Sequence, residues 1–561
     1  MSQQLKRESQ PSMDFLLFAT LCQTLESESS RLKKIDILAE ALRTMPESDI
    51  APCMYLIRGT PFPEWSQETL GIGPNLLYEA LAYVSGMKRD EVIARLNTVG
   101  DIGSAAFELL EHKSQTSFFF SSLTLQDVYM DLVNLSRKIG DKSQREKLRV
   151  IQGLLSAASP LEGKYLVGIL LGDMRIGTGE GTVREALAKA FGVLAADIDF
   201  AFQVRNDIGE VALLCFKGEE ALRQAALTLY HPVRMMLAQQ GSITDVLAAS
   251  GEVAAEYKYD GARFQFHLGS QGCKIYSRRL EDVTDSLPDI AQALTASCAD
   301  EVILDGEAIA IDKDGRPLPF QTVLRRFRRK HGVLEASNQV TLVPKIFDIL
   351  YHNGELLITH SCRERRRILN KVLQDHVTPR IESGDEHEIE QYYHNALDSG
   401  HEGIMLKLLD SAYTPGLRGK EWIKIKPQPD SLDLIIVGAE WGEGRRGKLF
   451  GSFLVACRED ASSEKLIPIS KVATGFTDQD LEDVYAELKD QIIGEDRKNV
   501  TFKPQLVLEV GYSEIQMSPT YEGGFALRFP RLLQVRRDKG IFDIHSLSDI
   551  SERYASKIEK G

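Results

Sequence analysis

The sequence predicts a multidomain protein with an all-α N-terminal domain, an α+β middle domain and a C-terminal β-barrel. The chain has 561 residues, too many for one hydrophobic core. Apolar residues recur at helical spacings from about residue 12 to residue 226, and short alternating runs replace them after about residue 250. Short strand-like runs then follow a polar segment, which is typical of a small closed barrel. The predicted domains span residues 1–226, 227–427 and 428–561.

Each predicted domain contains segments that justify its class. In the first, runs such as DFLLFATLCQTLE and VREALAKAFGVLA carry apolar stripes of helical period. In the second, β-rich runs such as EVILDGEAIAI and EWIKIK alternate with helical stretches such as CRERRRILNKVLQ. In the third, runs such as LDLIIVGAEW and QLVLEVGY predict five or six strands, and residues 549–561 predict a terminal helix. Two prolines in segment 426–434 predict a linker and a hinge.

The composition excludes several classes of protein. With 43% hydrophobic and 26% charged residues, the chain is an ordinary globular protein rather than a disordered one. No apolar run approaches the ~20 residues that span a bilayer, and no signal-type apolar core follows the first ten residues, so we expect a cytoplasmic protein without membrane contact. Seven cysteines without a CxxC pair predict buried free thiols rather than a zinc site or disulfides.

The charge distribution is more informative than the net charge. A net charge of −14 argues, taken alone, against DNA as a partner. Basic residues nevertheless gather in four runs, at residues 325–330, 363–367, 445–448 and 536–539. Such runs suit one inner surface of an otherwise acidic protein. For any single run, a solvated face without a ligand is the alternative interpretation.

A short motif after the change of periodicity indicates covalent chemistry. Lys258 stands among β-type residues and is followed by Asp260, Gly261 and Arg263. K-x-D-G alone arises by chance in about one chain in ten of this length. Further motifs follow in order: Ser277-Arg278, LDGE at 304–307, IFDIL at 346–350, EGIMLK at 402–407 and WIKIK at 422–426. The ordered set resembles the nucleotidyltransferase motifs of the superfamily that contains ATP-dependent DNA ligases, RNA ligases and mRNA capping enzymes.

The chemistry of that superfamily explains the residue types. A lysine amine attacks phosphorus only when it is neutral, whereas a free lysine has a pKa of ~10.4, so we expect neighbouring cations to lower the pKa of Lys258. Arg263, Arg278, Lys424 and Lys426 are the cations expected to do so and to offset charge on the triphosphate. Attack on the α-phosphorus with loss of pyrophosphate gives a lysyl-AMP. The expected cofactors are therefore ATP and Mg²⁺ or Mn²⁺.

The resemblance implies roles for further residues of the core. Glu307 would contact the ribose or a metal and Glu402 would help to hold the metal, two roles that the sequence does not separate. Phe347 would stack on adenine, with core packing as the alternative, and Glu256 would lie near the base. Arg418, in a Gly-flanked loop, is either a nucleotide contact or an exposed loop residue.

The end of the chain resembles the last motif of cellular ATP-dependent ligases, in the run ALRFPRLLQVRRDKG at 526–540. Arg536 and Lys539 match its basic positions, which implies that they reach the pyrophosphate when the barrel closes over ATP. Gln534 departs from the pattern, because relatives often have a basic residue there. The resemblance thus implies an ATP-grasp-like nucleotidyltransferase core and an OB-fold barrel that moves about the 426–434 pivot.

The helical domain favours DNA as the substrate. It resembles the DNA-binding domain of archaeal and eukaryotic replicative ligases, which capping enzymes and typical RNA ligases lack. Within residues 172–191, Thr182 and Glu185 predict a capping box that opens a helix. Backbone NH groups at such a helix start can hold a phosphate without reading bases. A simple glycine-rich connection is the alternative. The residues expected to contact DNA phosphate are Arg175, Gly177, Thr178, Gly179, Gly181 and Thr182.

A second feature of the helical domain suggests a protein partner. Gln115, Phe118 and Phe119 resemble the short motif by which archaeal ligases dock on the sliding clamp of the PCNA type. The run lacks the spacing of the full clamp-binding motif, and a buried apolar run is the alternative.

These features predict a monomeric ATP-dependent DNA ligase. It would seal 5′-phosphate/3′-hydroxyl nicks in double-stranded DNA during replication, repair and recombination. Lys258 takes AMP from ATP and passes it to the 5′-phosphate, and the 3′-hydroxyl then displaces AMP. The rival interpretations are a GTP-using capping enzyme, an RNA ligase and a non-catalytic DNA scaffold. An NAD-dependent ligase would be expected to carry a four-cysteine zinc site.

Overall fold

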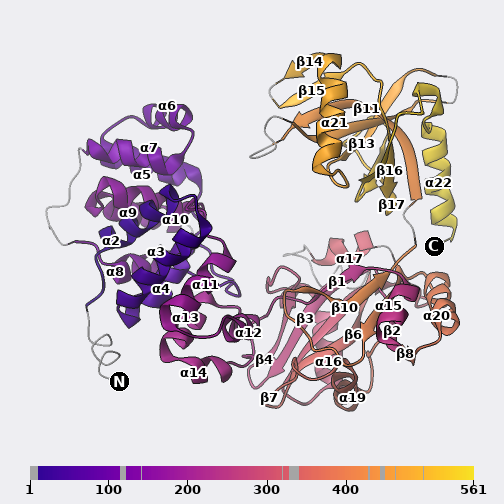
Figure 1. Cartoon of the computed structure of the whole chain (residues 1–561), viewed down its shortest axis with the longest axis horizontal. Helices are drawn as coiled ribbons and strands as arrows, with labels where there is room; N and C mark the ends of the chain where they lie inside the picture. Colours follow the sequence, from indigo (N-terminus) through magenta and orange to yellow (C-terminus); the bar gives the residue numbers. More distant parts are fainter. Residues whose placement is uncertain are drawn as a thin grey trace. The chain divides into compact units, whose positions relative to one another are not determined.

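The computed structural model describes residues 11–113, 122–140, 142–318, 320–327, 340–427, 430–442, 449–460, 463–496 and 498–560. The chain divides into two compact units, Met1–Ile425 and Lys426–Gly561. The first unit contains a helical part and a part with two β-sheets, and the second contains a third large sheet (Figure 1). Among the described residues, no helix is long and apolar enough to cross a membrane.

The N-terminal part of the first unit is built of helices, as the apolar periodicity predicts. Its interior is formed by apolar side chains that are fully buried, such as Phe18, Ile50 and Leu166. The buried carboxylate of Asp207 ties the part together by accepting hydrogen bonds from Tyr55 Oη at 2.6 Å and Trp65 Nε1 at 3.2 Å. The helices are α2 (Phe15–Ser27), α3 (Arg31–Thr44), α4 (Glu47–Ile57), α5 (Pro74–Ser85), α6 (Arg89–Val99), α7 (Ile102–Glu111), α8 (Leu125–Ser136), α9 (Ser143–Ala157), α10 (Pro160–Leu171), α11 (Glu180–Phe191), α12 (Ala195–Arg205), α13 (Ile208–Lys217) and α14 (Glu219–Arg223).

The predicted capping box at Thr182 is wrong. Helix α11 begins at Glu180, and its N-cap is Gly179, which has extended backbone angles and no side chain to cap the helix. Thr182 is therefore already inside the first turn and is buried. Glu185 reaches outward instead and pairs with Arg31 at 2.5 Å. An acidic residue at position 180 suits the positive end of the helix dipole, which explains the earlier start.

Two five-stranded sheets form the rest of the first unit, which confirms the mixed helix-and-strand class. One sheet has the order β1 (Leu237–Gln240), β10 (Arg418–Ile425), β9 (Gly403–Leu408), β2 (Val253–Lys258) and β8 (Arg380–Ser383). The other has the order β4 (Gly272–Ser277), β3 (Ala262–Gly269), β5 (Val302–Ile311), β6 (Thr341–His352) and β7 (Glu355–Leu356). The accompanying helices are α15 (Ile243–Ser250), η1 (Thr284–Ser286), α16 (Pro288–Ser297), α17 (Phe320–Phe327), α19 (Cys362–Val372) and α20 (Glu386–Asp398).

Helices cover these sheets on their apolar faces. α16 and α19 pack on β6, and α20 packs on β9 and β2 (Figure 1). The basic run 363–367 lies on α19, and it is neither a uniform ligand surface nor a uniformly solvated face. Arg363 is exposed and pairs with glutamates, whereas Arg365 is fully buried. The helical period explains this difference, because positions two residues apart lie on different sides of a helix.

The second unit is β-rich, as predicted, with a half-barrel sheet. Strand β11 (Asp430–Trp441) pairs with three neighbours, and β17 (Glu514–Met517) and β18 (Phe525–Arg528) form a separate two-stranded sheet. The predicted terminal helix is present as α22 (Leu547–Lys560). The other elements are β12 (Phe450–Arg458), β13 (Leu466–Val472), α21 (Asp478–Leu488), η3 (Lys489–Gln491), β14 (Ile492–Asp496), β15 (Asn499–Phe502), β16 (Val507–Tyr512), β19 (Arg531–Arg536) and η4 (Ile541–Asp543).

The predicted linker 426–434 is too long. Residues from Asp430 onward already belong to β11 and pair with β16, from Asp430 opposite Tyr512 to Leu434 opposite Leu508. Leu432 and Leu434 are fully buried, so this stretch alternates between the core and the outside as a strand does. The two prolines misled the prediction because they lie just before the strand rather than inside it.

Candidate active site

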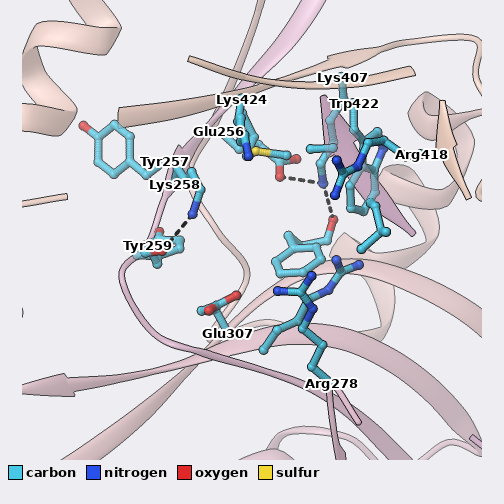
Figure 2. A pocket seen from close by; sticks show the side chains of 15 residues that line it. Glu256, Tyr257, Lys258, Tyr259, Arg278, Glu307, Lys407, Arg418, Trp422 and Lys424 are labelled. Atoms are coloured by element: carbon cyan, nitrogen blue, oxygen red, sulfur yellow. Dashed lines mark hydrogen bonds and ion pairs between the residues drawn. The ribbon is translucent and has the colours of Figure 1, made fainter. Parts of the chain in front are cut away.

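A cavity of about 260 Å³ is lined by residues from both sheets of the first unit (Figure 2). Strands β2, β3, β5, β6, β9 and β10 all contribute side chains to it. The structure thus brings most of the sequence-predicted core residues to one place. Those that line the cavity are Glu256, Lys258, Arg263, Arg278, Glu307, Phe347, Arg418 and Lys424.

Lys258 is the last residue of β2 and is held next to the start of β9. Its carbonyl accepts a hydrogen bond of 3.0 Å from the backbone of Glu402, and its Cα pairs with that of Gly403. The Lys258 ammonium forms an ion pair of 2.6 Å with the Glu402 carboxylate. Both side chains keep about a quarter of their surface exposed, at 24% and 25%. The amine is therefore anchored but open to a ligand.

Arg263 is fixed by a buried carboxylate that was not predicted from the sequence. Its guanidinium donates two hydrogen bonds to Asp305, of 2.9 and 2.6 Å, and one of 2.5 Å to the Met236 carbonyl. Tyr413 donates a further bond of 2.6 Å to Asp305. Burial lowers the pKa of Arg263, but the Asp305 carboxylate outweighs it and raises that pKa above its ordinary value. Arg263 thus provides a permanent, pre-oriented cation.

Glu307 lies beside Arg263 because the two residues are opposite each other on β5 and β3. Burial raises the pKa of Glu307 to about 7; Lys258 and Arg263 lower it, while Asp305 and Glu402 raise it. Figure 2 shows Lys258, Glu307 and Arg278 around the same space. The carboxylate is therefore poised between its neutral and charged forms near physiological pH.

The glycine of the K-x-D-G motif lets the Lys258 turn approach β5. A Cβ at Gly261 would lie 2.5 Å from the Ala308 carbonyl oxygen and 2.7 Å from Glu307 Cγ. These distances are too short for any side chain. Glycine at this position thus permits Lys258 and Glu307 to line one cavity.

Arg278 projects from a tight turn after β4. Ser277 Oγ accepts hydrogen bonds from the backbones of Arg279 at 3.3 Å and Glu281 at 3.2 Å. Gln67, from the helical part, donates to the Leu280 carbonyl at 2.6 Å and accepts from the Asp282 backbone at 2.9 Å. Gln67 of the helical part therefore supports the turn that carries Arg278, one of the cations of the cavity.

Comparison with known proteins connects this geometry to a family. Three family models match: DNA ligase N terminus over residues 14–188, ATP dependent DNA ligase domain over 235–426, and ATP dependent DNA ligase C terminal region over 446–539. The DNA ligase of Methanospirillum hungatei is 57% identical over 542 residues, covering 97% of this chain and 98% of that protein. The chain belongs to the ATP-dependent DNA ligases.

Other relatives agree with this membership. The DNA ligase of Archaeoglobus fulgidus is 40% identical over 554 residues, covering 98% of this chain and 99% of its own length. The solved structure named Pmar-Lig_PreS3 covers 92% of this ligase and 99% of its own chain, with a TM-score of 0.56 and 20% identity, and is similar in fold. Methanospirillum and Archaeoglobus are both archaea, in line with the resemblance of the helical domain to that of archaeal and eukaryotic replicative ligases.

Several predicted residues of the ligase lie outside the cavity. Lys426 follows β10 as the first residue of the second unit and is not among the lining residues. Arg536 and Lys539 lie in the second unit, where both form ion pairs with Asp433, at 3.7 and 2.6 Å. Gln115, Phe118 and Phe119 fall outside the described residues.

The glycine-rich segment of the helical part lines a second, open cavity of about 410 Å³ with Arg58. Arg175 and Gly177 both have positive φ, of 51° and 65°, so the chain turns sharply there. Lys34 donates to the carbonyls of Ile176 at 2.7 Å and Gly177 at 3.3 Å. Of the predicted DNA-binding residues, Arg175, Gly177, Thr178 and Gly179 line this cavity, whereas Gly181 and Thr182 do not.

Several residues that line the cavity or support its walls were not predicted from the sequence, among them Asp305, Lys407, Tyr413 and Trp422. Asp305 lies inside the LDGE motif, two positions before Glu307, and the period of a strand puts both on one face. That alternation is the signal that could have found Asp305. Lys407 ends the EGIMLK motif and Trp422 begins the WIKIK motif, but no role was predicted for either side chain. Tyr413 lies between the two motifs and has no local signal of its own.

We expect Gly261→Ala to damage both folding and adenylation. Because the added methyl would meet a backbone oxygen, the change should cost ~1–3 kcal/mol of unfolding free energy. The turn must shift, so lysyl-AMP formation should fall about 100-fold. Denaturant unfolding and labelling with α-labelled ATP measure the two effects. Gly153→Ala in α9, where a Cβ meets nothing within 4 Å, is the matched control. It should lower neither the unfolding free energy nor the rate of lysyl-AMP formation to a comparable extent.

Glu307 should make stability depend on pH. Its pKa is raised to about 7 in the folded ligase, so the folded state binds the proton more tightly than the unfolded state does. Its contribution to the unfolding free energy is therefore complete below pH ~4.5 and is lost as the pH rises through about 7. The shift corresponds to on the order of 3 kcal/mol. We expect the unfolding free energy of Glu307→Gln, relative to wild type, to increase from pH 5 to pH 8. An unchanged difference would contradict the assignment; Glu390→Gln, at an exposed position, controls for the charge change.

Proposed function

We propose that Lys258 is the nucleophile with which this ligase takes AMP from ATP. The observation that carries the proposal is the position of its amine in a cavity that also holds the cations Arg263, Arg278, Arg418 and Lys424. The amine forms a bond to the α-phosphorus while the bond to pyrophosphate breaks. The surrounding cations offset charge on the phosphates during this step.

The nucleotide would lie with its phosphates near Lys258 and its base near Glu256. Phe347 is half-buried, lines the cavity and is therefore placed for a ring contact with adenine. Arg418 stands at the exposed start of β10, at the cavity edge, which supports its interpretation as a nucleotide contact.

A divalent ion fits the carboxylates beside Lys258. Glu307 and Glu402 influence each other electrostatically and provide the hard oxygen ligands that Mg²⁺ and Mn²⁺ prefer. When bound, such an ion supplies positive charge opposite the phosphates. Glu307 must lose its proton to serve as a ligand, so binding of the ion should weaken as the pH falls below about 7, the pKa of this carboxyl.

Nicked duplex DNA would be held through its backbone by the glycine-rich segment. Thr178 Oγ1 is buried and has no hydrogen-bond partner among the described residues, although it lines the second cavity. A phosphate oxygen would satisfy this hydroxyl. Arg58 and Arg175 line the same cavity and supply charge, and Gly181 and Thr182 belong to the helix start behind it.

The remaining parts of the ligase support the later steps. We assign residues 1–226 to DNA binding, 227–427 to adenylation and 428–561 to the OB-fold domain, which the matched family segments support. Arg536, Lys539 and Lys426 would meet the nucleotide phosphates when the barrel turns about the short connection after β10.

The cellular setting is part of the same proposal. The ligase would act as a monomer on chromosomal DNA in the cytoplasm. Gln115, Phe118 and Phe119 would dock it on a sliding clamp. Full clamp affinity in a folded Phe118/Phe119 double alanine variant would refute this docking.

The proposal is tested by a chase. The ligase is first labelled with α-labelled ATP and Mg²⁺ and then freed of unbound nucleotide. It is next mixed with one of three acceptors: a nicked DNA duplex, a nicked RNA duplex or the uncapped 5′ ends of RNA. We expect the label to leave the protein and nicks to close only with the DNA duplex. Arg175→Ala combined with Thr178→Val should slow the chase without changing the initial labelling. Transfer to RNA ends in preference to DNA would overturn the substrate assignment.

A further inference from the structure

Lys407 is a buried lysine that joins three strands at one end of the nucleotide cavity. It lies on β9 and is 1% exposed. Its ammonium pairs with the Glu256 carboxylate of β2 at 2.7 Å and donates to the Phe347 carbonyl of β6 at 3.1 Å (Figure 2). The rings of Trp422 and Phe347 lie 4.4 and 4.9 Å from the same nitrogen. The carboxylate, the carbonyl and the two rings thus hold the Lys407 ammonium in place.

In this arrangement only one of the two carboxylate oxygens of Glu256 has a hydrogen-bond donor within the described part of the chain. One carboxylate oxygen, Oε2, is engaged by Lys407. The other, Oε1, is buried and has no hydrogen-bond partner among the described residues. Arg366 and Arg380 form ion pairs with it at 3.6 and 3.9 Å, which are too long to be hydrogen bonds. Because Glu256 lines the cavity, Oε1 is an acceptor that a ligand donor would complete.

The chemistry of purines determines which donor fits. Adenine carries an amino group at position 6, which donates, whereas guanine carries a carbonyl oxygen there, which only accepts. A carboxylate oxygen held in one direction would attract the first group and repel the second. A Glu256 side chain free to rotate would lose this selection.

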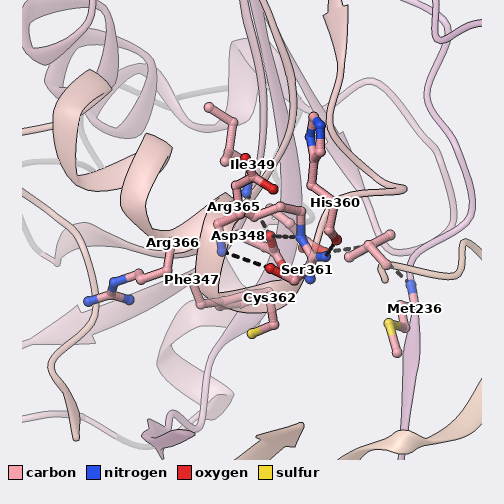
Figure 3. Close-up of polar contacts among 12 residues, drawn as sticks. Met236, Phe347, Asp348, Ile349, His360, Ser361, Cys362, Arg365 and Arg366 are labelled. Carbon is pink, nitrogen blue, oxygen red and sulfur yellow. Dashed lines mark hydrogen bonds and ion pairs between the residues drawn. The ribbon is translucent and has the colours of Figure 1, made fainter. Parts of the chain in front are cut away.

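The residue that follows Phe347 is also held by a buried contact. The next residue on β6, Asp348, forms two hydrogen bonds of 2.8 and 3.1 Å with the buried Arg365 of α19 (Figure 3). Lys407 holds the Phe347 backbone from the cavity side and Arg365 holds Asp348 from the helix side. The ring that faces the base is therefore fixed relative to the Glu256 carboxylate.

We propose that Lys407 is a positioning residue that sets the selection of 6-amino over 6-oxo purines, by fixing Glu256 and Phe347 around the base. The inference rests on the proposed placement of the base beside Glu256. It adds a specificity-determining residue that touches the recognising groups and not the reacting atoms. Lys407 thereby differs from Lys258, Arg263 and Lys424, which we place near the phosphates.

The test compares nucleotides in the first step. Initial rates of protein labelling are measured with α-labelled ATP, GTP and purine riboside triphosphate, which lacks the 6-amino group. In Lys407→Met we expect kcat/KM for ATP to fall about 30-fold while the values for the other two nucleotides change less than about threefold. Lys407→Arg keeps a cation beside Glu256 and should retain part of the preference for ATP.

A purely structural role makes a different prediction. If Lys407 only stabilised the fold, all three nucleotides would lose activity equally, and an unchanged ATP-to-GTP ratio would overturn the inference. Lys147→Met, which removes a buried lysine of the helical part bonded to the Leu70 carbonyl, is the matched control and should leave the ratio intact. If Lys407→Met does not fold, the ratio in Lys407→Gln, which removes the charge but keeps a polar side chain, decides: an ATP preference equal to that of wild type refutes the inference. Wild-type protein that shows no label at Lys258 would instead refute the proposed function.

Discussion

Replacing Lys258 with alanine is expected to abolish transfer of label from α-labelled ATP to the protein and to lower nick sealing by at least about 10⁴-fold. The amine is held in the cavity by its ion pair of 2.6 Å with Glu402, and its removal leaves the cations of the cavity without a nucleophile. A denaturing gel after incubation with ATP and Mg²⁺ measures the first effect, and a nicked duplex measures the second.

A substrate that bypasses the first step separates chemistry from folding. A nicked duplex already adenylated at its 5′-phosphate needs only attack by the 3′-hydroxyl, so Lys258→Ala should still seal it at a substantial rate. Lys420→Ala removes an exposed lysine of β10 and is the matched control for the loss of a lysine. Persistent labelling of Lys258→Ala would move the nucleophile elsewhere, and failure on the adenylated duplex would indicate a folding defect.

The class of each part was predictable because burial imposes a period on the sequence. Helices with one apolar face repeat at 3.6 residues and strands at two, and both patterns are long in this ligase. Boundaries were less predictable, because they depend on contacts outside the local sequence. Leu432 and Leu434 follow two prolines and resemble part of a linker, yet pairing with β16 makes them a strand. Similarly, Gly179 starts α11 without any capping side chain.

The cavity was predictable where the chemistry demands a residue type at a fixed spacing. Lys258, Arg263, Glu307 and Lys424 all came from ordered motifs, and all line the cavity. The buried residues that hold these side chains in place were not predictable, because their contacts join positions far apart in the chain. Asp305 meets Tyr413 across 108 positions, and such a pair leaves no local signature.

The buried pair of Arg365 and Asp348 gives the largest expected effect on stability. The side chains are 0% and 3% exposed and form two parallel hydrogen bonds (Figure 3). The Asp348 carboxylate has a lowered pKa because Arg365, and after it Lys407, outweigh the effect of burial. Removing the guanidinium in Arg365→Met should therefore leave an uncompensated buried charge and lower the unfolding free energy by ~3–5 kcal/mol. Denaturant unfolding measures this loss.

A double variant separates the contribution of the ion pair from that of the other hydrogen bonds of Arg365. Replacing both charges with Arg365→Met and Asp348→Leu removes the unpaired carboxylate, so part of the lost stability should return. The return should be incomplete, because Arg365 also donates to the part-buried carbonyls of His360 at 2.6 Å and Ser411 at 3.0 Å, which lose that donor in both variants. Arg363→Met, at an exposed position of the same helix, should cost much less stability than Arg365→Met, because solvent screens exposed ion pairs. If the single and double variants lost equal stability, the ion pair would contribute nothing and the two carbonyl contacts would account for the whole effect.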